Sequence, residues 1–179
     1  MAGATRAFNG VRLVWGCESF GPGFGQGLDP ADSDAALAAL AEWGCVELDT
    51  ARIYGDGEAE GALGAALAGS SAQFAVATKA HPKWSLSYEG VHEQVATSLA
   101  ELGVESVELL YLHSVDPEAP LEGALRAVDE LAAAGKVKEF VSHPHFSTHL
   151  LLLPGRALIT VRAAGPVELL GVADGPVLL

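Results

Sequence analysis

The sequence predicts an α/β fold built around a parallel sheet, and three observations support this. Short apolar runs alternate with longer segments of helical periodicity, and the connections between them are short. This alternation is typical of right-handed βαβ units, which form parallel sheets. The chain has 179 residues, half of them hydrophobic, which is enough for one domain with a sizeable core.

Five apolar runs have the length and composition expected of strands. In chain order they are Val11–Gly16, Val46–Asp49, Phe74–Thr78, Val107–Leu112 and Lys136–Val141. Glycines and polar residues separate each run from the helical segment that follows it, so every run is bounded by turn signals.

The segments between these runs carry helix signals. The first helix begins at Asp29-Pro30 and ends before Gly44, because Asp is a favoured helix cap and Pro fits the first turn. Three more helices are expected over Glu58–Ala68, Ser87–Leu102 and Pro120–Ala134, each closed by a glycine. In the last two, apolar residues recur at three- and four-residue spacing.

Four strand–helix units and a fifth strand are therefore expected, whereas a closed eight-fold barrel takes about 250 residues. We predict a partial parallel (β/α) fold of the TIM-barrel type over residues 1–149, truncated after the fifth strand. Residues 150–179 contain no Lys and no aromatic residue, and Pro and Gly interrupt them repeatedly. We expect an atypical, irregular apolar tail there, in which Ala157–Val161 and Val167–Val172 are candidate short strands.

The composition excludes several classes of function. A formal net charge of −13 argues against nonspecific binding to nucleic acid or to anionic membranes. No apolar stretch approaches the roughly 20 residues that span a bilayer, and the N-terminal residues lack the apolar core of a signal peptide. Cys17 and Cys45 form no C-x-x-C pair and are expected to be reduced and buried. These features predict a cytoplasmic protein.

Four polar residues stand at or just beyond the ends of three of these apolar runs: Asp49, Tyr54, Lys79 and His113. If the runs are parallel strands of one barrel, these side chains meet at its C-terminal mouth, where barrel enzymes place their chemistry. A neighbouring ammonium stabilises a phenolate, a carboxylate keeps the ammonium charged, and a neutral imidazole can bind a carbonyl oxygen. Together they fit protonation of a carbonyl oxygen while hydride reaches the carbon.

At this point the sequence resembles the aldo-keto reductase family over roughly residues 10–143, and most closely its branch of aflatoxin-aldehyde and succinic-semialdehyde reductases. The matching stretches are Glu47–Gly55, Ala77–Lys79, Glu108–His113 and Gly135–Glu139. The resemblance implies NADPH-dependent reduction of a small aldehyde or ketone without a metal. It also implies a (β/α) barrel fold.

The resemblance also implies a role for each rim residue. Tyr54 would donate the proton, Lys79 would stabilise its phenolate, Asp49 would pair with Lys79, and His113 would orient the substrate carbonyl. Asp49 and Ser142 would contact the nicotinamide of the cofactor.

The chain departs from the family pattern after the fifth strand. The family's Gly-x-Ser-Asn pattern is matched only by Ser142, and its later cofactor-binding residues are not recognisable after Phe146. We therefore hypothesise that NADPH binding by this chain is weak or absent. An open half-barrel has unpaired edges, so self-association through these edges is expected. The alternative to an active reductase is a catalytically inactive, truncated relative that acts through protein–protein contacts.

Two further clusters have spacings that resemble ligand-binding patterns. The Gly21–Gly27 loop misses the G-x-G-x-x-G spacing, and we interpret it as a flexible loop at the barrel mouth. His143, His145 and His149 have a zinc-like spacing but lack the partner pattern of barrel metal hydrolases. We expect a solvated cluster and no metal site.

Four residues near the strand ends have local interpretations. His81 and Trp84 follow Lys79 and either line a substrate pocket or simply pack within their loop. Glu58 and Glu60 lie in the first turn of a helix, where they favour the helix dipole, and solvated caps are the expected state of both.

Overall fold

The computed structural model describes residues 12–21, residues 27–141 and the backbone of residues 142 and 159–160. The strands are β1 (Trp15–Gly16), β2 (Glu47–Asp49), β3 (Ala75–Ala80), β4 (Val107–Leu112), β5 (Val137–Ser142) and β6 (Ile159–Thr160). The α-helices are α1 (Pro30–Glu42), α2 (Ala59–Gly69), α3 (Tyr88–Leu102) and α4 (Leu121–Ala133). Two 3-10 turns, η1 (Tyr54–Gly57) and η2 (Pro82–Trp84), follow β2 and β3.

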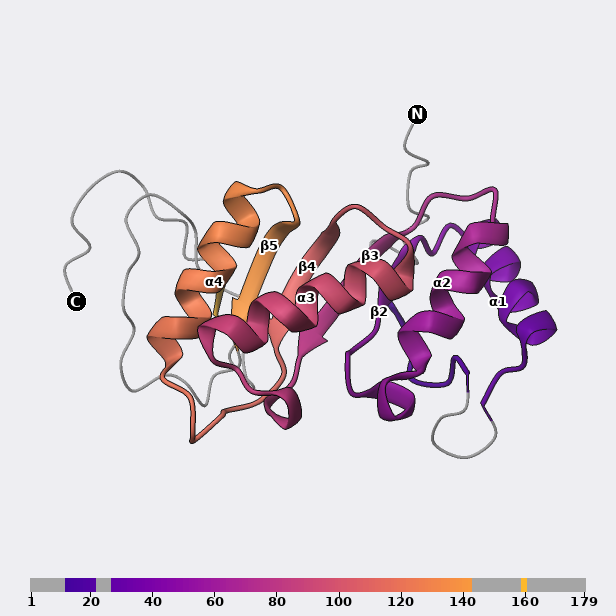
Figure 1. Ribbon diagram of the computed structural model, residues 1–179. Coiled ribbons are helices and arrows are strands. Elements are labelled where there is room, and N and C mark those ends of the chain that lie inside the picture. The colour runs from indigo at the N-terminus through magenta and orange to yellow at the C-terminus, as the bar shows by residue number, and fades with distance from the viewer. Residues whose placement is uncertain (1–11, 22–26, 143–158, 161–179) are drawn as a thin grey trace.

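The described strands form one sheet in the order β1-β2-β3-β4-β5-β6, and every neighbouring pair is parallel. Helices α1 to α4 follow one another along the sheet, and each contacts the next (Figure 1). The parallel α/β fold that the sequence predicts is confirmed. Because all the strands run the same way, their carboxyl ends lie at one edge of the sheet.

The helix boundaries follow from the capping residues expected at their ends. The Asp29 side chain accepts a hydrogen bond from the backbone N–H of Asp32 at 2.8 Å, and Pro30 is the first residue of α1. The Ser87 hydroxyl accepts from the backbone N–H of Gly90 at 3.1 Å and caps α3. Gly103 ends α3 in the left-handed conformation, with φ of 67°, which glycine adopts without steric cost.

The core lies between the helices and one face of the sheet. In β3, Val76, Thr78 and Ala80 are buried against the helices, and the register aligns the last two with Leu110 and Leu112 of β4. The helices contribute apolar side chains to this core, including Leu37, Leu63, Val91, Val95, Leu102, Val128 and Leu131. The opposite face of β3 carries Lys79, which is therefore presented away from the helix layer.

The bounds of β4 are as predicted, those of β2, β3, β5 and β6 differ by one or two residues at one or both ends, and those of β1 differ more. The first strand was expected over Val11–Gly16, but β1 comprises only Trp15–Gly16, because it pairs with just two residues of the short β2. β6 lies inside the predicted Ala157–Val161 strand and pairs with the end of β5. The predicted strand Val167–Val172 and the boundary at residues 149/150 lie outside the described residues. In the described part of the chain, no helix has the length and hydropathy needed to cross a membrane.

Candidate active site

The four residues predicted at the barrel mouth lie at or just beyond the carboxyl ends of three neighbouring strands, and we call them the rim residues: Asp49, Tyr54, Lys79 and His113. Asp49 is the last residue of β2, Lys79 lies one residue before the end of β3, and His113 directly follows β4. Tyr54 begins the turn η1 beyond β2. The backbone N–H of His113 donates to the carbonyl of Ala80 at 2.9 Å, so the end of β4 is held beside that of β3.

Lys79 is the centre of this group. Its Nζ lies 2.5 Å from Asp49 Oδ1, 2.7 Å from the carbonyl oxygen of Thr50 and 3.2 Å from the Tyr54 hydroxyl. An ammonium has three hydrogens and no acceptor, so these contacts use all of them. The Tyr54 oxygen therefore accepts from Lys79, and its own hydrogen remains available to donate to another group. Only 12% of the Lys79 side chain is exposed, which strengthens the ion pair with Asp49.

His113 and His81 stand beside the phenol. The Tyr54 and His113 rings are nearly perpendicular with centroids 6.0 Å apart, and the His113 and His81 rings are 5.2 Å apart. Burial, followed by the charge of Lys83, lowers the pKa of His81, so this imidazole is neutral at pH 7. His81 Nδ1 accepts from the backbone N–H of Lys83 at 3.0 Å, which assigns the proton of the neutral ring to Nε2.

His81 and Trp84 pack against each other beside the rim. The His81 ring contacts His113, and the Trp84 ring meets the His81 ring edge-on with centroids 6.4 Å apart. The Arg52 guanidinium and the Lys83 ammonium also lie 5.1 and 4.8 Å from the centroid of the Trp84 ring. Trp84 thus packs within its loop, and whether either residue lines a substrate pocket stays a prediction.

The loop that carries Tyr54 is folded back onto β3. The backbone N–H of Arg52 donates to the carbonyl of Lys79 at 3.1 Å, and that of Tyr54 donates to Ala51 at 3.0 Å. Gly55 and Asp56 then both adopt left-handed φ angles, of 57° and 56°. This reversal turns the chain into α2 and leaves the Tyr54 side chain over Lys79, with the ring centroid 4.9 Å from Nζ.

Glu60 corrects one sequence-based prediction. Glu58 is exposed as expected, but Glu60 has no exposed surface, so it is not a solvated cap. Its carboxylate accepts from the Thr78 hydroxyl at 2.6 Å and from the Ser98 hydroxyl at 2.8 Å, and Arg52 lies 3.6 Å away. The first-turn position favoured the helix-dipole interpretation. The signal that was overlooked is that Glu60 precedes the buried Leu63 and Gly64 by three and four residues, on the same helix face.

The residues expected to hold the nicotinamide lie along the same edge. Asp49 retains 32% of its side chain exposed beside Lys79, so its second oxygen is available to a ligand amide. Ser142 is the last residue of β5 and aligns with Leu112, the last residue of β4. The free Asp49 oxygen is an acceptor suited to the amide N–H of a nicotinamide, while only the backbone of Ser142 belongs to the described part of the chain. The nearby cations Arg52 and Lys83 are already paired with carboxylates, so they are poorly suited to the phosphates of NADPH.

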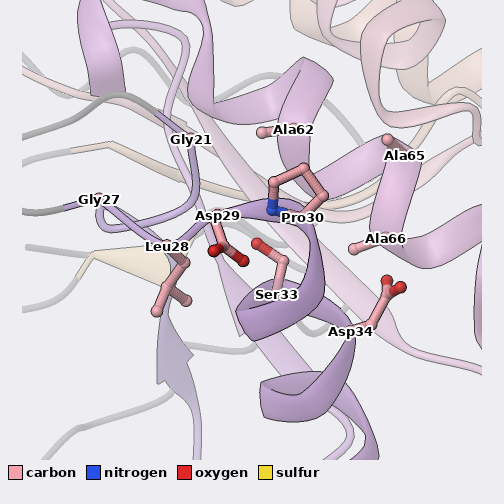
Figure 2. Close-up of a pocket in the computed structure, with 10 residues that line it drawn as sticks. All are labelled: Gly21, Gly27, Leu28, Asp29, Pro30, Ser33, Asp34, Ala62, Ala65 and Ala66. Carbon is pink, nitrogen blue, oxygen red and sulfur yellow. The ribbon is translucent and has the colours of Figure 1, made fainter.

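The described ends of the glycine loop line a hollow that none of the four rim residues lines. Gly21 and Gly27 border this hollow of about 500 Å³, which lies between the start of α1 and one face of α2 (Figure 2). The polar groups there are Asp29, which caps α1, together with Ser33 and Asp34. Two carboxylates make the hollow unsuitable for an anionic cofactor. Residues 22–26 lie outside the described part of the chain.

Metal-type side chains do not gather in the described residues. Between residues 12 and 142, apart from 22–26, no three His, Cys, Asp or Glu side chains lie close enough together to hold an ion. His143, His145 and His149 fall outside the described residues.

Comparison with known proteins identifies the family. The sequence model of the aldo/keto reductase family matches residues 12–142, nearly three quarters of the chain. The chain belongs to the aldo/keto reductase family. Human aflatoxin B1 aldehyde reductase member 4 is 40% identical over 121 residues, which cover 64% of this chain and 36% of that protein. Rat aflatoxin B1 aldehyde reductase member 2 is 37% identical over 142 residues, 76% of this chain and 38% of that protein.

Solved structures of the family share the fold of this aldo/keto reductase chain. The glycerol dehydrogenase of Gluconobacter oxydans superimposes with a TM-score of 0.66 at 28% identity, over 74% of this chain and 44% of that one. A Klebsiella pneumoniae aldo-keto reductase in complex with NADPH gives a TM-score of 0.62 at 26% identity, over 73% and 44%. The chain thus spans little more than a third of the curated relatives' length.

Proposed function

We propose that this chain contributes the proton-donating site of an NADPH-dependent reductase of aldehydes or ketones. The observation that carries the proposal is the contact of 3.2 Å between Lys79 Nζ and the Tyr54 hydroxyl, with Asp49 on the same ammonium. Family membership supports an oxidoreductase that acts on carbonyls. The names of the relatives favour an aldehyde as the substrate.

Each side chain has a definite part in the proposed reaction. Tyr54 donates its phenolic proton to the carbonyl oxygen, and the Lys79 ammonium stabilises the phenolate that remains. Asp49 holds Lys79 in place through their ion pair. His113 lies beside the phenol and would hold the carbonyl oxygen next to the Tyr54 hydroxyl.

NADPH would supply the hydride to the carbonyl carbon, in the way usual for nicotinamide cofactors. Asp49 and Ser142 would contact its nicotinamide from the carboxyl ends of β2 and β5, which have β3 and β4 between them in the sheet.

The test is consumption of NADPH, followed at high cofactor concentration with an aromatic aldehyde. Tyr54→Phe should lose about 100- to 10,000-fold in kcat, the usual contribution of a positioned proton donor. Its circular dichroism and unfolding midpoint should match those of the wild-type protein, because the substitution removes one hydroxyl. Turnover by Tyr54→Phe at the wild-type rate would remove Tyr54 from the mechanism.

A second proposal is that the chain self-associates through the edge of the sheet at β1. Among the described strands, β1 pairs only with β2. Beside it, a groove of about 400 Å³ between β1 and α1 is lined only by apolar residues. Trp15 and Trp43 of that groove are 46% and 59% exposed, and such contiguous exposure marks a contact surface.

The occupant proposed for this groove is a second copy of the chain. Sedimentation equilibrium should give a mass above that of the monomer, and Trp43→Glu should lower it by placing a charge in the apolar groove. Lys138→Glu, on the exposed surface of β5, is the control and should leave the mass unchanged. A monomeric wild-type protein at all concentrations would exclude this proposal.

A further inference from the structure

We propose that Glu60 and Arg52 are positioning residues that hold Tyr54 and Lys79 at hydrogen-bonding distance. Neither residue contacts the Tyr54 hydroxyl or Lys79 Nζ: Glu60 binds the side chain of the residue before Lys79, and Arg52 binds the backbone of the turn that carries Tyr54. This inference rests on the proposed function for its kinetic test, and the experiment below includes a readout that does not depend on turnover.

Glu60 fixes the Lys79 side of the site. It is completely buried in the first turn of α2, and one carboxylate oxygen accepts from the hydroxyl of Thr78, the residue immediately before Lys79. The other oxygen accepts from Ser98 of α3. One carboxylate thus ties α2 and α3 to β3, at the point where β3 presents Lys79 to the rim.

Arg52 fixes the Tyr54 side. Its guanidinium reaches two Glu101 oxygens at 3.2 and 3.4 Å and donates to the carbonyl of Gly57 at 2.9 Å. Gly57 is the last residue of η1, which Tyr54 begins, so this bond closes the turn that carries the phenol. The backbone N–H of Arg52 is bonded to the carbonyl of Lys79, which links the turn directly to β3.

The ion pair between Glu60 and Arg52 joins these two sides. Their closest atoms are 3.6 Å apart, and the Arg52 side chain is only 14% exposed. Burying such a pair is costly, and apolar residues of similar volume often stabilise a fold better. An apolar pair would fill the space between α2 and α3, but it could not bind Thr78 and Gly57 directionally. Compared with an apolar pair, Glu60 and Arg52 therefore add directional hydrogen bonds to Thr78 and Gly57.

A loss of this network should move Tyr54 relative to Lys79 while leaving the core packed. Displacing a reacting group by about 1 Å can reduce the rate as much as 100-fold. Glu60→Gln is the sharpest test, because it preserves shape and still accepts from one hydroxyl, yet removes the charge that faces Arg52. Arg52→Lys is the second variant, since it keeps the charge but lacks the planar fork that reaches Glu101 and Gly57 together.

The control is Val95→Ala, a buried change in α3 that costs stability without touching the network. We expect Glu60→Gln and Arg52→Lys to lower kcat roughly 10- to 100-fold, with the KM for the aldehyde unchanged. Val95→Ala should keep the wild-type kcat at a temperature where all the proteins are folded. A network that serves stability alone would leave kcat unchanged in all three variants, and this result would overturn the proposal.

The readout independent of turnover is the ¹³Cζ resonance of Tyr54 in tyrosine-labelled protein, assigned through Tyr54→Phe. In both network variants it should shift, while that of Tyr88, on the surface of α3 and α4, should not. If the wild-type protein shows no turnover, the proposed function fails, and this resonance alone decides the positioning role. A Tyr54 resonance identical to that of the wild type in Glu60→Gln and Arg52→Lys would exclude it.

Discussion

Replacing Gly64 with alanine should destabilise the protein, whereas the same replacement at Gly61, three residues earlier in α2, should not. A Cβ added at Gly64 would lie 2.0 Å from the carbonyl oxygen of Glu101 and 2.9 Å from the Cα of Leu102. Ordinary contact begins near 3.4 Å, and both neighbours are backbone atoms that cannot rotate away. A Cβ at Gly61 meets nothing within 4 Å.

The magnitude follows from two opposing effects. Alanine is favoured over glycine in a helix by up to about 1 kcal/mol, and this gain applies to both variants. Only Gly64→Ala must push α3 away from α2, and such overpacking costs about 1–3 kcal/mol. Because the helix-propensity gain cancels, Gly64→Ala should be less stable than Gly61→Ala by about 1–3 kcal/mol.

Urea unfolding followed by circular dichroism measures this difference directly from the two midpoints, provided that the slopes are equal. The displaced residue is Glu101, whose side chain binds Arg52, so Gly64→Ala should also reduce activity. Equal midpoints for the two variants would show that α2 and α3 do not approach each other as closely as the structure has them.

Three other properties can be tested on the same protein. Burial raises the pKa of Cys17 to about 12, so a thiol reagent at pH 8 should label it only after unfolding, as mass spectrometry of the peptides can check. Burial also raises the pKa of Glu60 above 4.5, so the folded state binds its proton more tightly than the unfolded state. The stability of the wild-type protein relative to Glu60→Gln should therefore fall as the pH rises through that value, and a flat difference would contradict the raised pKa. Fluorescence titration should show that NADPH binds with an affinity weaker than micromolar. The cations near the site, Arg52 and Lys83, are already paired with carboxylates and are poorly suited to the phosphates of the cofactor. Micromolar affinity would refute this prediction.

The topology of the site follows from the sequence because it depends on backbone rules. Parallel strands with short connections place all carboxyl ends at one edge, so residues that follow separate apolar runs must approach one another. Asp49, Lys79 and His113 each lie at or beside a strand end, so their approach could be predicted without knowing which side chains surround them. The cap at Asp29 and the left-handed end at Gly103 are equally local, and they too were predicted from a few residues each.

The network around Glu60 could not be predicted in the same way, because its three partners come from three separate segments of the chain. Thr78, Ser98 and Arg52 are 18, 38 and 8 positions away, and none of these spacings is a recognised motif. An acidic residue in a first helical turn has a sufficient local explanation, which hides the tertiary one. Only the helical periodicity of α2, which places Glu60 on the same face as Leu63 and Gly64, indicated that Glu60 is buried.

The residues at the strand ends and the residue on the turn are held in place by different parts of the fold. Strand ends bring an ammonium, a carboxylate and an imidazole to one edge, but Tyr54 is on a turn, where strand geometry does not fix it. Its contact with Lys79 depends on a chain reversal through two left-handed residues, closed by the bond from Arg52 to Gly57. Arg52 is in turn held by Glu60 and Glu101, from two different helices. The Tyr54 side chain is therefore held from the helix layer behind the sheet, and the proposed positioning role would account for the charged pair buried there.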